Sequence, residues 1–328
     1  MKQILGRSGI EVSAMGIGCW AMGGPWTYDS KTDDPNAAGW GKVDDKESIR
    51  AIHAGLDLGI NFFDTAANYG AGHSERVLAE ALAGRRDRVV IATKFGYLVD
   101  EDKKLIVNDQ DVILENIHQD CENSLRRLNT DYIDLYQFHV GDFPPEKAEA
   151  VRDSLEDLVR EGKIRWYGWS TDNAAGARVF AEGEHCTAIQ QDLYWCAPVD
   201  YYTPTLQVCE QFNLASINRS PLGMGILTGK FYGRDIELPD NDIRHDWNFA
   251  EGEIAELVQQ VEHLKEILTS NGRTRAQGAI CWLWARSQVT IPIPGFKTVE
   301  QVTENAKAMD FGPLTKSQMD EIATILKS

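Results

Sequence analysis

The chain has 328 residues, of which 43% are hydrophobic and 25% charged, a composition typical of a folded chain with one large domain or two ordinary ones. Its 50 acidic and 33 basic residues give a formal net charge of -17, which disfavours nucleic acid and anionic membranes as partners. The N-terminus lacks an apolar secretory signal and no apolar run approaches the roughly 18 residues of a membrane span, so we expect a cytoplasmic protein. Its six cysteines are scattered without a CxxC pair, and we therefore expect no metal site and no disulfide framework.

Helical stretches alternate with short apolar strands along almost the whole chain, which predicts parallel strand–helix–strand units. The first helix is expected to begin at Asp44, which would form a capping box with Glu47, and to stop at Gly59. Ser74 is expected to cap a second helix, and an apolar stripe over 114–128 predicts a third. The predicted strands cover residues 15–20, 61–64, 89–94, 132–139, 164–170, 188–191, 215–218 and 290–293.

Eight parallel strands in about 300 residues predict a closed (β/α)8 barrel, the TIM barrel, formed by one domain over residues 1–328. The main alternative is a doubly wound open sheet, whose glycine fingerprint GxGxxG is absent. Two long segments, 23–42 after the first strand and 220–251 after the seventh, leave the carboxyl ends of their strands. We therefore expect both loops to form walls for substrate and cofactor at the mouth of the barrel.

Three successive predicted strands end in an ionisable residue, which a purely structural strand would avoid. Asp64, Lys94 and His139 stand at these ends, and Tyr69 follows Asp64 by five residues. Because chemistry in such barrels occurs at the carboxyl ends of the strands, we expect the four side chains to meet there. A desolvated Lys94 would need Asp64 as its anion, and the lysine cation would lower the pKa of Tyr69. Tyr69 would then exchange a proton with the substrate, whose oxygen His139 would orient.

Each of these residues alone also has a purely structural explanation. Asp64 could cap a loop, Lys94 could extend its ammonium group toward water, and His139 could be a hydrogen-bonded core residue. Their occurrence together at one barrel mouth favours a catalytic site.

The segments LGINFFDTAANYGAGHSE, VVIATKFG and YIDLYQFH resemble those of the aldo-keto reductases, and the likeness runs through most of the chain. The resemblance implies that Asp64, Tyr69, Lys94 and His139 form the family's catalytic tetrad. It implies Tyr69 as the general acid for reversible reduction of a carbonyl by a nicotinamide cofactor. Lys94 and Asp64 would tune its acidity, and His139 would place the carbonyl.

The resemblance also implies a nicotinamide site along the later strands. Ser170 and Gln191 would hold the carboxamide, although Thr171 stands where many relatives have an asparagine. Ser220, in a segment similar to the family's cofactor loop, would contact the pyrophosphate. Arg219 replaces an aromatic residue that commonly stacks on the nicotinamide, and it could stack likewise or bind an acidic substrate. The cofactor residues assigned in these parts of the chain are Trp20, Ser170, Gln191, Arg219, Ser220, Leu222, Gly223, Gly225 and Lys230.

The segment IPIPGFKTVEQVTEN combines this resemblance with an independent physical argument. Thr298 and Gln301 predict a capping box that opens a helix beside Lys297, and a helix N-terminus beside a lysine is an anion site. An ordinary capped helix with a solvated lysine would share the pattern. By resemblance, Lys297 and Gln301 would meet the adenosine 2'-phosphate, so we expect NADP(H) rather than NAD(H). The residues assigned here are Gly295, Lys297 and Gln301, with Glu304 and Asn305 at the adenine.

Aromatic and basic residues are expected around the mouth, where they would bind the substrate or simply pack the loops onto the barrel. Arg219, Arg244 and His245 would add a subsite for a polar or anionic group, or merely lie in solvent. We expect a small polar aldehyde, ketone or sugar as substrate. The tryptophans expected in this region are Trp20, Trp26, Trp40, Trp195 and Trp247.

Three other functions fit parts of the sequence. A non-catalytic nicotinamide-binding auxiliary protein, like the subunits that accompany some channels, would not need the intact tetrad. A barrel lyase would use Lys94 as a Schiff base, although the neighbouring Asp64 predicts a charged amine. A metal hydrolase would need more histidine ligands than His139 supplies.

Overall fold

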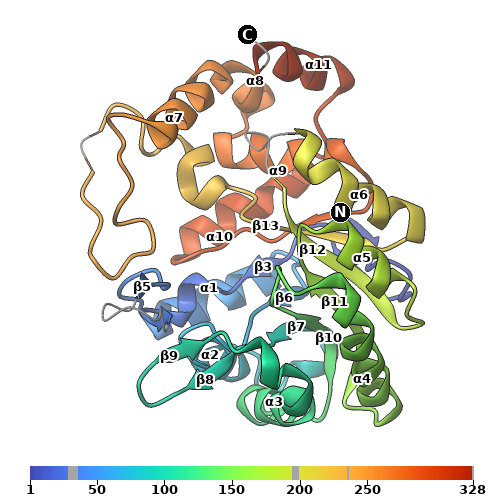
Figure 1. Cartoon of the computed structure of the whole chain (residues 1–328). Helices are drawn as coiled ribbons and strands as arrows, with labels where there is room; N and C mark the ends of the chain where they lie inside the picture. Colours follow the sequence, from blue (N-terminus) through green and yellow to red (C-terminus); the bar gives the residue numbers. More distant parts are fainter. Residues whose placement is uncertain (29–35, 194–198, 235, 327–328) are drawn as a thin grey trace.

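A computed structural model describes residues 1–28, 36–193, 199–234 and 236–326 of the chain, and its centre is a sheet of eight parallel strands (Figure 1). Each strand pairs with the barrel strand that precedes it and the one that follows it in the chain, as strand–helix–strand units require. The strands are β3 (Ile17–Gly18), β6 (Phe62–Asp64), β7 (Val90–Phe95), β10 (Ile133–Phe138), β11 (Ile164–Ser170), β12 (Cys186–Asp192), β13 (Ala215–Arg219) and β14 (Thr290–Pro292).

The sheet closes on itself between β3 and the segment that follows β14. The amides of Gly16 and Gly18 donate to the carbonyl oxygens of Pro292 and Pro294 at 2.9 and 3.0 Å, and Gly18 forms a parallel bridge with Gly295. The predicted (β/α)8 barrel is thereby confirmed. The first strand is shorter than the predicted 15–20, since only two of its residues form a regular ladder.

Helices cover the outside of the barrel, as Figure 1 shows. Within the described residues, no helix is long and apolar enough to span a membrane. The helices are α1 (Asp45–Asp57), α2 (His73–Ala81), α3 (Ile113–Leu128), α4 (Ala148–Arg160), α5 (Ala174–Ala181), α6 (Val199–Phe212), α7 (Glu253–His263), α8 (Lys265–Thr269), α9 (Arg275–Arg286), α10 (Val299–Ala306) and α11 (Lys316–Ile325).

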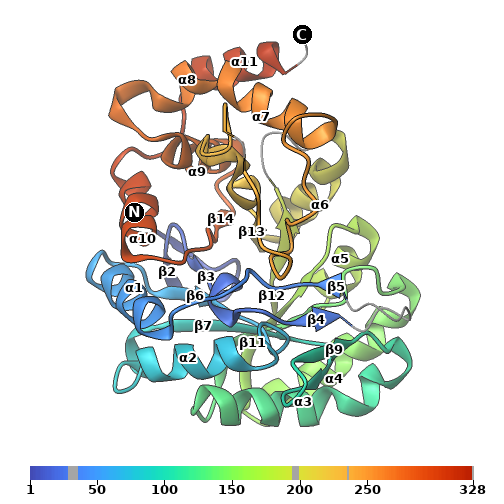
Figure 2. The same cartoon turned by 90° about the vertical axis from the view of Figure 1, so that its left-hand side faces the viewer.

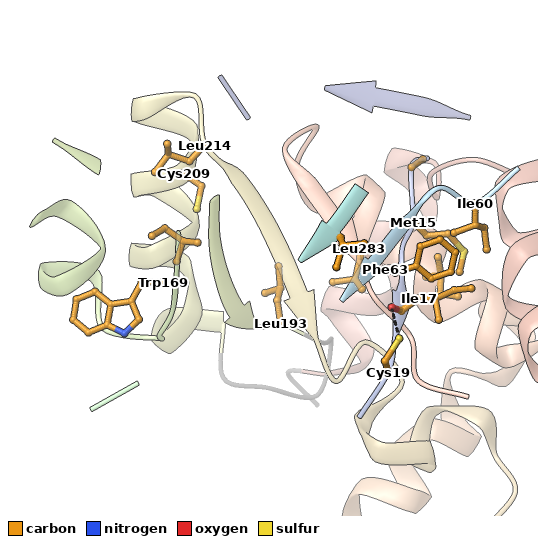
Figure 3. Close-up of a cluster of buried hydrophobic side chains, with 14 of the residues drawn as sticks. Met15, Ile17, Cys19, Ile60, Phe63, Trp169, Leu193, Cys209, Leu214 and Leu283 are labelled. Carbon is orange, nitrogen blue, oxygen red and sulfur yellow. Dashed lines mark hydrogen bonds between the residues drawn. The ribbon is translucent and has the colours of Figure 1, made fainter. Parts of the chain in front are cut away.

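The main hydrophobic core lies between the strands and these helices. Figure 3 shows part of it, including Met15, Ile17 of β3, Phe63 of β6 and Leu283 of α9. A second core fills the interior of the barrel. The end of the barrel opposite its mouth is covered by an N-terminal hairpin of β1 (Lys2–Ile4) and β2 (Glu11–Ser13). The sequence analysis missed this hairpin. The interior residues include Phe62, Val90, Ala92, Leu135, Ala188, Ala215 and Ile217, with Leu5 and Val12 from the hairpin region.

The first long loop adds two short strands beside the mouth. These are β4 (Thr27–Tyr28) and β5 (Asn36–Ala37), which join the hairpin of β8 (Leu98–Asp100) and β9 (Leu105–Val107) in a four-stranded sheet. The sequence analysis predicted loop here and no strands. Residues 29–35 of this loop lie outside the described residues, as does Trp195.

The two long mouth loops are joined to each other by backbone hydrogen bonds. The amide of Gly41 donates to the carbonyl of Asn241 at 3.1 Å, and the amide of Ile243 donates to the carbonyl of Gly39 at 2.9 Å. In Figure 2 the orange segment before α7 accordingly reaches down to the blue segment that carries β4 and β5. We refer to these contacts as the loop bridge.

Each of the two predicted capping boxes forms only one of its two hydrogen bonds, the one accepted by the N-cap side chain. Asp44 caps α1, but the side chain of Glu47 accepts from the amide of Val299 at 2.9 Å instead of closing the box. Thr298 likewise caps α10, while the Gln301 side chain accepts from the amide of a different residue, Lys297. In α1 the third residue thus holds a neighbouring segment, whereas in α10 it holds the residue directly before the N-cap.

The predicted cap at Ser74 is wrong. Gly72 is the N-cap of α2, and Ser74 lies within the first turn of that helix. Its hydroxyl donates to the carbonyl oxygen of Cys19 at 2.9 Å, so a contact with the loop after β3 takes the side chain away from the helix end.

Gly18 lies at the seam where the barrel closes, so a side chain at this position should weaken the closure. Gly18→Ala is expected to lower the free energy of unfolding by about 1 to 3 kcal/mol, because the added methyl group would lie 2.6 Å from the carbonyl oxygen of Ile293. Gly295→Ala is the matched control across the same seam, since its methyl group would meet only the Gly18 oxygen, at 3.8 Å. Urea unfolding followed by circular dichroism measures the difference, and equal stability of the two variants would contradict the prediction.

Candidate active site

The interior of the barrel changes from apolar to polar at the carboxyl ends of its strands. Side chains two positions apart on a strand point to the same face of the sheet. The apolar interior layer formed by residues such as Phe62 and Ala92 is therefore followed, two residues later, by a polar layer. Its members are Asp64, Lys94, Gln137, Gln190 and Arg219.

Lys94 is fully buried, and its ammonium group makes three hydrogen bonds. It donates to Asp64 Oδ1 at 2.5 Å, to the carbonyl oxygen of Thr65 at 2.8 Å and to the Tyr69 hydroxyl at 3.2 Å. An ammonium group has three donors, so all of them are used. The paired charges are thus satisfied where water does not reach them.

The second carboxylate oxygen of Asp64 is held by two glutamines. Gln137 Nε2 donates to Asp64 Oδ2 at 2.9 Å, and Gln190 Nε2 donates to the same atom at 2.8 Å. Neither glutamine was singled out from the sequence as a site residue. Their signal was present, since both occupy inward-facing positions of buried strands where an apolar residue is usual.

Tyr69 and His139 meet at the bottom of a cavity. Their rings lie 5.8 Å apart and nearly perpendicular, and Trp20 stacks on the other side of Tyr69 at 6.0 Å. His139 Nδ1 is buried and has no hydrogen-bond partner among the described residues. The four residues predicted to converge therefore do lie together at one end of the barrel.

The pKa values differ in one respect from the expectation. Burial and the charge of Asp64 raise the pKa of Tyr69 well above its ordinary value, so the predicted lowering by Lys94 is not found. Asp64 neutralises the lysine charge, and desolvation of the phenol dominates. Burial, with the charges of Lys94 and Arg219, lowers the pKa of His139 well below its ordinary value. At neutral pH Tyr69 is therefore protonated and His139 uncharged.

The cavity above the tetrad has a volume of about 800 Å³, within the upper range of small-molecule sites. Asp64, Tyr69 and His139 line one part of it. Most of the predicted cofactor residues line it as well, namely Trp20, Arg219, Ser220, Leu222, Gly225, Lys230, Gly295, Lys297, Gln301, Glu304 and Asn305.

Three predicted cofactor residues are not among the described residues that line this cavity. Gly223 lies in the loop that follows β13 with φ +52°, a conformation that favours glycine. Ser170 is buried at the end of β11. Gln191 points toward the helices, where its amide donates to Ser216 Oγ at 2.7 Å, because it has the opposite strand parity to Gln190.

Three cations line the part of the cavity formed by the mouth loops and α10. They are Lys230, Arg244 and Lys297. Asp242 binds the Arg244 guanidinium through both oxygens, and Glu304 of α10 also lines the cavity. Partial desolvation and the charges of Arg244 and Lys297 lower the pKa of Lys230 to about 8. This excess of positive charge suits an anionic ligand such as a phosphate group.

Arg244 and Lys297 also contact the first mouth loop. The guanidinium of Arg244 lies 4.4 Å from the ring centre of Trp40, and Lys297 Nζ donates to the carbonyl oxygen of Trp40. Sequence analysis considered Arg244 only as part of a substrate subsite. Its position in the cation cluster follows from the loop bridge, which the sequence does not reveal.

Arg219 is held by an ion pair. Its guanidinium donates to both carboxylate oxygens of Asp172, to Oδ1 at 3.3 Å. Arg219 lines the main cavity and also a second cavity of about 460 Å³ that includes Asp172 and Asn173. Stacking on a nicotinamide and binding of an acidic substrate both stay predictions for this residue.

Within the described ranges, no group of three or more His, Cys, Asp or Glu side chains is arranged to hold a metal ion. The donors present instead suit an organic ligand with one anionic end. The cations gather around Lys297 and Gln301, and the uncharged groups Tyr69 and His139 meet where a reacting oxygen would lie.

Comparison with solved structures and known sequences finds oxidoreductases that are similar to this chain over most of its length. The structure resembles that of the glycerol dehydrogenase AKR11B4 from Gluconobacter oxydans, with a TM-score of 0.80, 28% identity and coverage of 97% of this chain and 92% of that one. It also resembles an aldo-keto reductase from Klebsiella pneumoniae in complex with NADPH, with a TM-score of 0.69, 26% identity and coverage of 99% and 95%.

A curated relative from Schizosaccharomyces pombe, the aldo-keto reductase yakc, carries NADP(+) in its name. It is 30% identical over 307 residues, which cover 91% of this chain and 84% of the relative. The sequence model described as the Aldo/keto reductase family matches residues 14–327. Because this match covers nearly the whole chain, the protein belongs to the aldo/keto reductase family.

Proposed function

We propose that the protein is an NADP(H)-dependent oxidoreductase that interconverts a small carbonyl compound and its alcohol. The observation that carries the proposal is the buried Lys94, which binds Asp64 and the Tyr69 hydroxyl at the floor of the main cavity. The NADPH-bound Klebsiella pneumoniae structure and the NADP(+)-named relative support the choice of cofactor. When bound, NADPH supplies the hydride, and the residues of the chain supply the proton and the orientation.

Tyr69 would act as the general acid in carbonyl reduction. It is protonated at neutral pH and would donate its proton to the substrate oxygen. Lys94, 3.2 Å from the phenol oxygen, would stabilise the phenolate that remains. Asp64 and the two glutamines fix the direction of the ammonium group, and the uncharged His139 would orient the substrate oxygen.

The cation cluster would hold the phosphate groups of the cofactor. Lys297, beside the N-terminus of α10, would meet the 2'-phosphate together with Gln301, and Arg244 and Lys230 add positive charge there. Glu304 and Asn305 would contact the adenine. For the carboxamide, Ser170 and Gln191 stay predictions, and Gln190 is a further candidate since its side chain lines the cavity.

The alternatives receive less support from the geometry. A Schiff-base lyase needs a free amine, but all three donors of Lys94 bind protein oxygens. A non-catalytic auxiliary protein would have no need for the contacts among Tyr69, Lys94 and Asp64. The carbonyl substrate is expected to be polar, since tryptophans and buried polar groups share the cavity wall.

Loss of the acid tests the mechanism. Tyr69→Phe is expected to lower kcat/KM for aldehyde reduction by about 100- to 10,000-fold, because the proton donor is removed. The dissociation constant for NADPH, measured by fluorescence titration, should change less than about threefold, since Tyr69 lies away from the cation cluster. A variant that keeps most of its carbonyl reduction would place the acid elsewhere.

Selectivity between the two nicotinamide cofactors tests the role of Lys297. Lys297→Met is expected to raise the dissociation constant for NADPH about tenfold and that for NADH less than twofold, because one charge-assisted contact to the 2'-phosphate is lost. Lys42→Met removes an exposed lysine of the first mouth loop that does not line the cavity, and it serves as the control. Equal weakening of both cofactors by Lys297→Met would contradict the assignment.

The pH dependence follows from the directions of the two pKa shifts. The pKa of His139 is lowered and that of Tyr69 raised, so both keep one protonation state across the neutral range. With saturating NADPH, kcat/KM for reduction should show no inflection between about pH 6 and 8. Oxidation of the alcohol needs the deprotonated phenol, and its rate should increase with pH. An inflection near the ordinary pKa of histidine would contradict the expected state of His139.

A further inference from the structure

Two buried polar groups beside the tetrad have no hydrogen-bond partner among the described residues. Trp26 and Asn68 both line the main cavity, and they are 4% and 2% exposed. The indole N–H of Trp26 and the Oδ1 atom of Asn68 are the groups without a partner. A buried donor or acceptor that makes no hydrogen bond costs free energy, which a ligand recovers if it supplies the missing partner.

A chain of aromatic contacts links Trp26 to the reacting end of the cavity. The ring of Trp26 lies 4.9 Å from that of Tyr28, which lies 5.9 Å from Tyr97, which in turn lies 5.5 Å from His139. Asn68 belongs to the same wall because it directly precedes Tyr69. Trp26 also belongs to the same buried cluster as Tyr69, so a ligand group that meets Trp26 and Asn68 lies in the part of the cavity next to the tetrad.

Asn68 and Tyr28 belong to the same wall. Burial raises the pKa of Tyr28 to about 12, and the nearby side chains of Asn68 and Tyr97 oppose this rise. The Oδ1 atom of Asn68 has no partner among the described residues, so it is left to accept a hydrogen bond from a ligand.

A hydroxyl group is the ligand chemistry that satisfies both atoms. It accepts a hydrogen bond from the Trp26 indole and donates one to the Asn68 oxygen. A carboxylate only accepts, an ammonium only donates, and an alkyl group does neither. The aromatic rings of Tyr28 and Tyr97 suit the C–H groups of the same ligand.

We propose that Trp26 and Asn68 form a hydroxyl-binding subsite, which selects carbonyl substrates that carry a hydroxyl group near the reacting carbon. This inference rests on the proposed oxidoreductase function and names its substrate class as short hydroxyaldehydes and hydroxyketones. A site that hydrogen-bonds a substrate hydroxyl discriminates strongly against the analogue without it, because the protein groups are then left unpaired.

The kinetic test compares D-glyceraldehyde with propanal, which has the same carbon chain without hydroxyl groups. With NADPH, and with rates expressed per free aldehyde, the wild-type kcat/KM is expected to favour glyceraldehyde by about tenfold or more. Trp26→Phe and Asn68→Leu should each reduce this ratio about tenfold, mainly through glyceraldehyde, with propanal changed less than about threefold. Unchanged ratios in both variants would overturn the subsite.

A matched control shows whether any tryptophan substitution at the mouth has this effect. Trp247 packs against Phe231 and Phe249 and does not line the cavity. Trp247→Phe should leave the ratio of the two aldehydes as in the wild type. A loss of selectivity in this variant equal to that in Trp26→Phe would overturn the assignment to Trp26.

A binding measurement separates the subsite from the proposed reaction. In protein labelled with ¹⁵N, the indole N–H signal that is missing in Trp26→Phe identifies Trp26. Glycerol is expected to shift this signal, and 1-propanol is not. If neither aldehyde is reduced, the proposed function fails, but the subsite stands when glycerol still shifts the signal. An equal response to the two alcohols, or no response to either, overturns the subsite.

Discussion

The ion pair between Lys94 and Asp64 is the interaction on which the rest of the site depends. Two charges withdrawn from water are expensive, and the cost is offset only when every remaining donor and acceptor is bound. Here the ammonium binds three oxygens, and the carboxylate accepts from two glutamines on other strands. Removing one partner would leave the other charge buried and unpaired, at a cost of about 3 to 5 kcal/mol.

This arrangement requires a closed barrel. Asp64 and Lys94 come from the neighbouring strands β6 and β7, whereas Gln190 reaches the same carboxylate from β12, several strands further along the sheet. Such a contact is possible only when the sheet curves around its own interior. The apolar layers beneath keep water from the pair, and the hairpin below keeps that end covered. The buried ion pair therefore depends on the same packing that closes the barrel.

Much of the site could be predicted because the ends of the strands can be recognised from the pattern of residues. An ionisable residue after an apolar run indicates the mouth of a barrel, and Asp64, Lys94 and His139 all had this signal. The signal of the glutamines that complete the site was weaker, because a polar residue within a strand indicates a site only once its side chain is known to point into the barrel. The direction in which Gln191 points depends on strand parity, and one residue of register turns it from the cavity to the helices. Ser74 was assigned to a helix end because its partner, Cys19, lies far away in the chain.

The direction of the Tyr69 pKa shift also could not be predicted from the sequence. Proximity of a lysine predicts a lower value, but the net field depends on how closely Asp64 compensates the lysine charge and on how deeply the phenol is buried. The small sheet of β4, β5, β8 and β9 was missed for another reason. Its strands are only two or three residues long, so no periodic pattern marks them, and the pairing of β4 with β9, which joins the two halves of the sheet, spans a wide interval of chain.

The loop bridge has a consequence for how the walls of the cavity can move. One loop carries Trp26 and Trp40, the other carries Arg244 and Lys230, and all four residues line the main cavity. Backbone bonds and the contacts of Arg244 and Lys297 with Trp40 join the two loops. Neither loop can therefore shift without displacing the other, so the two walls of the cavity form one mechanical unit although they are separated by about 200 residues of chain.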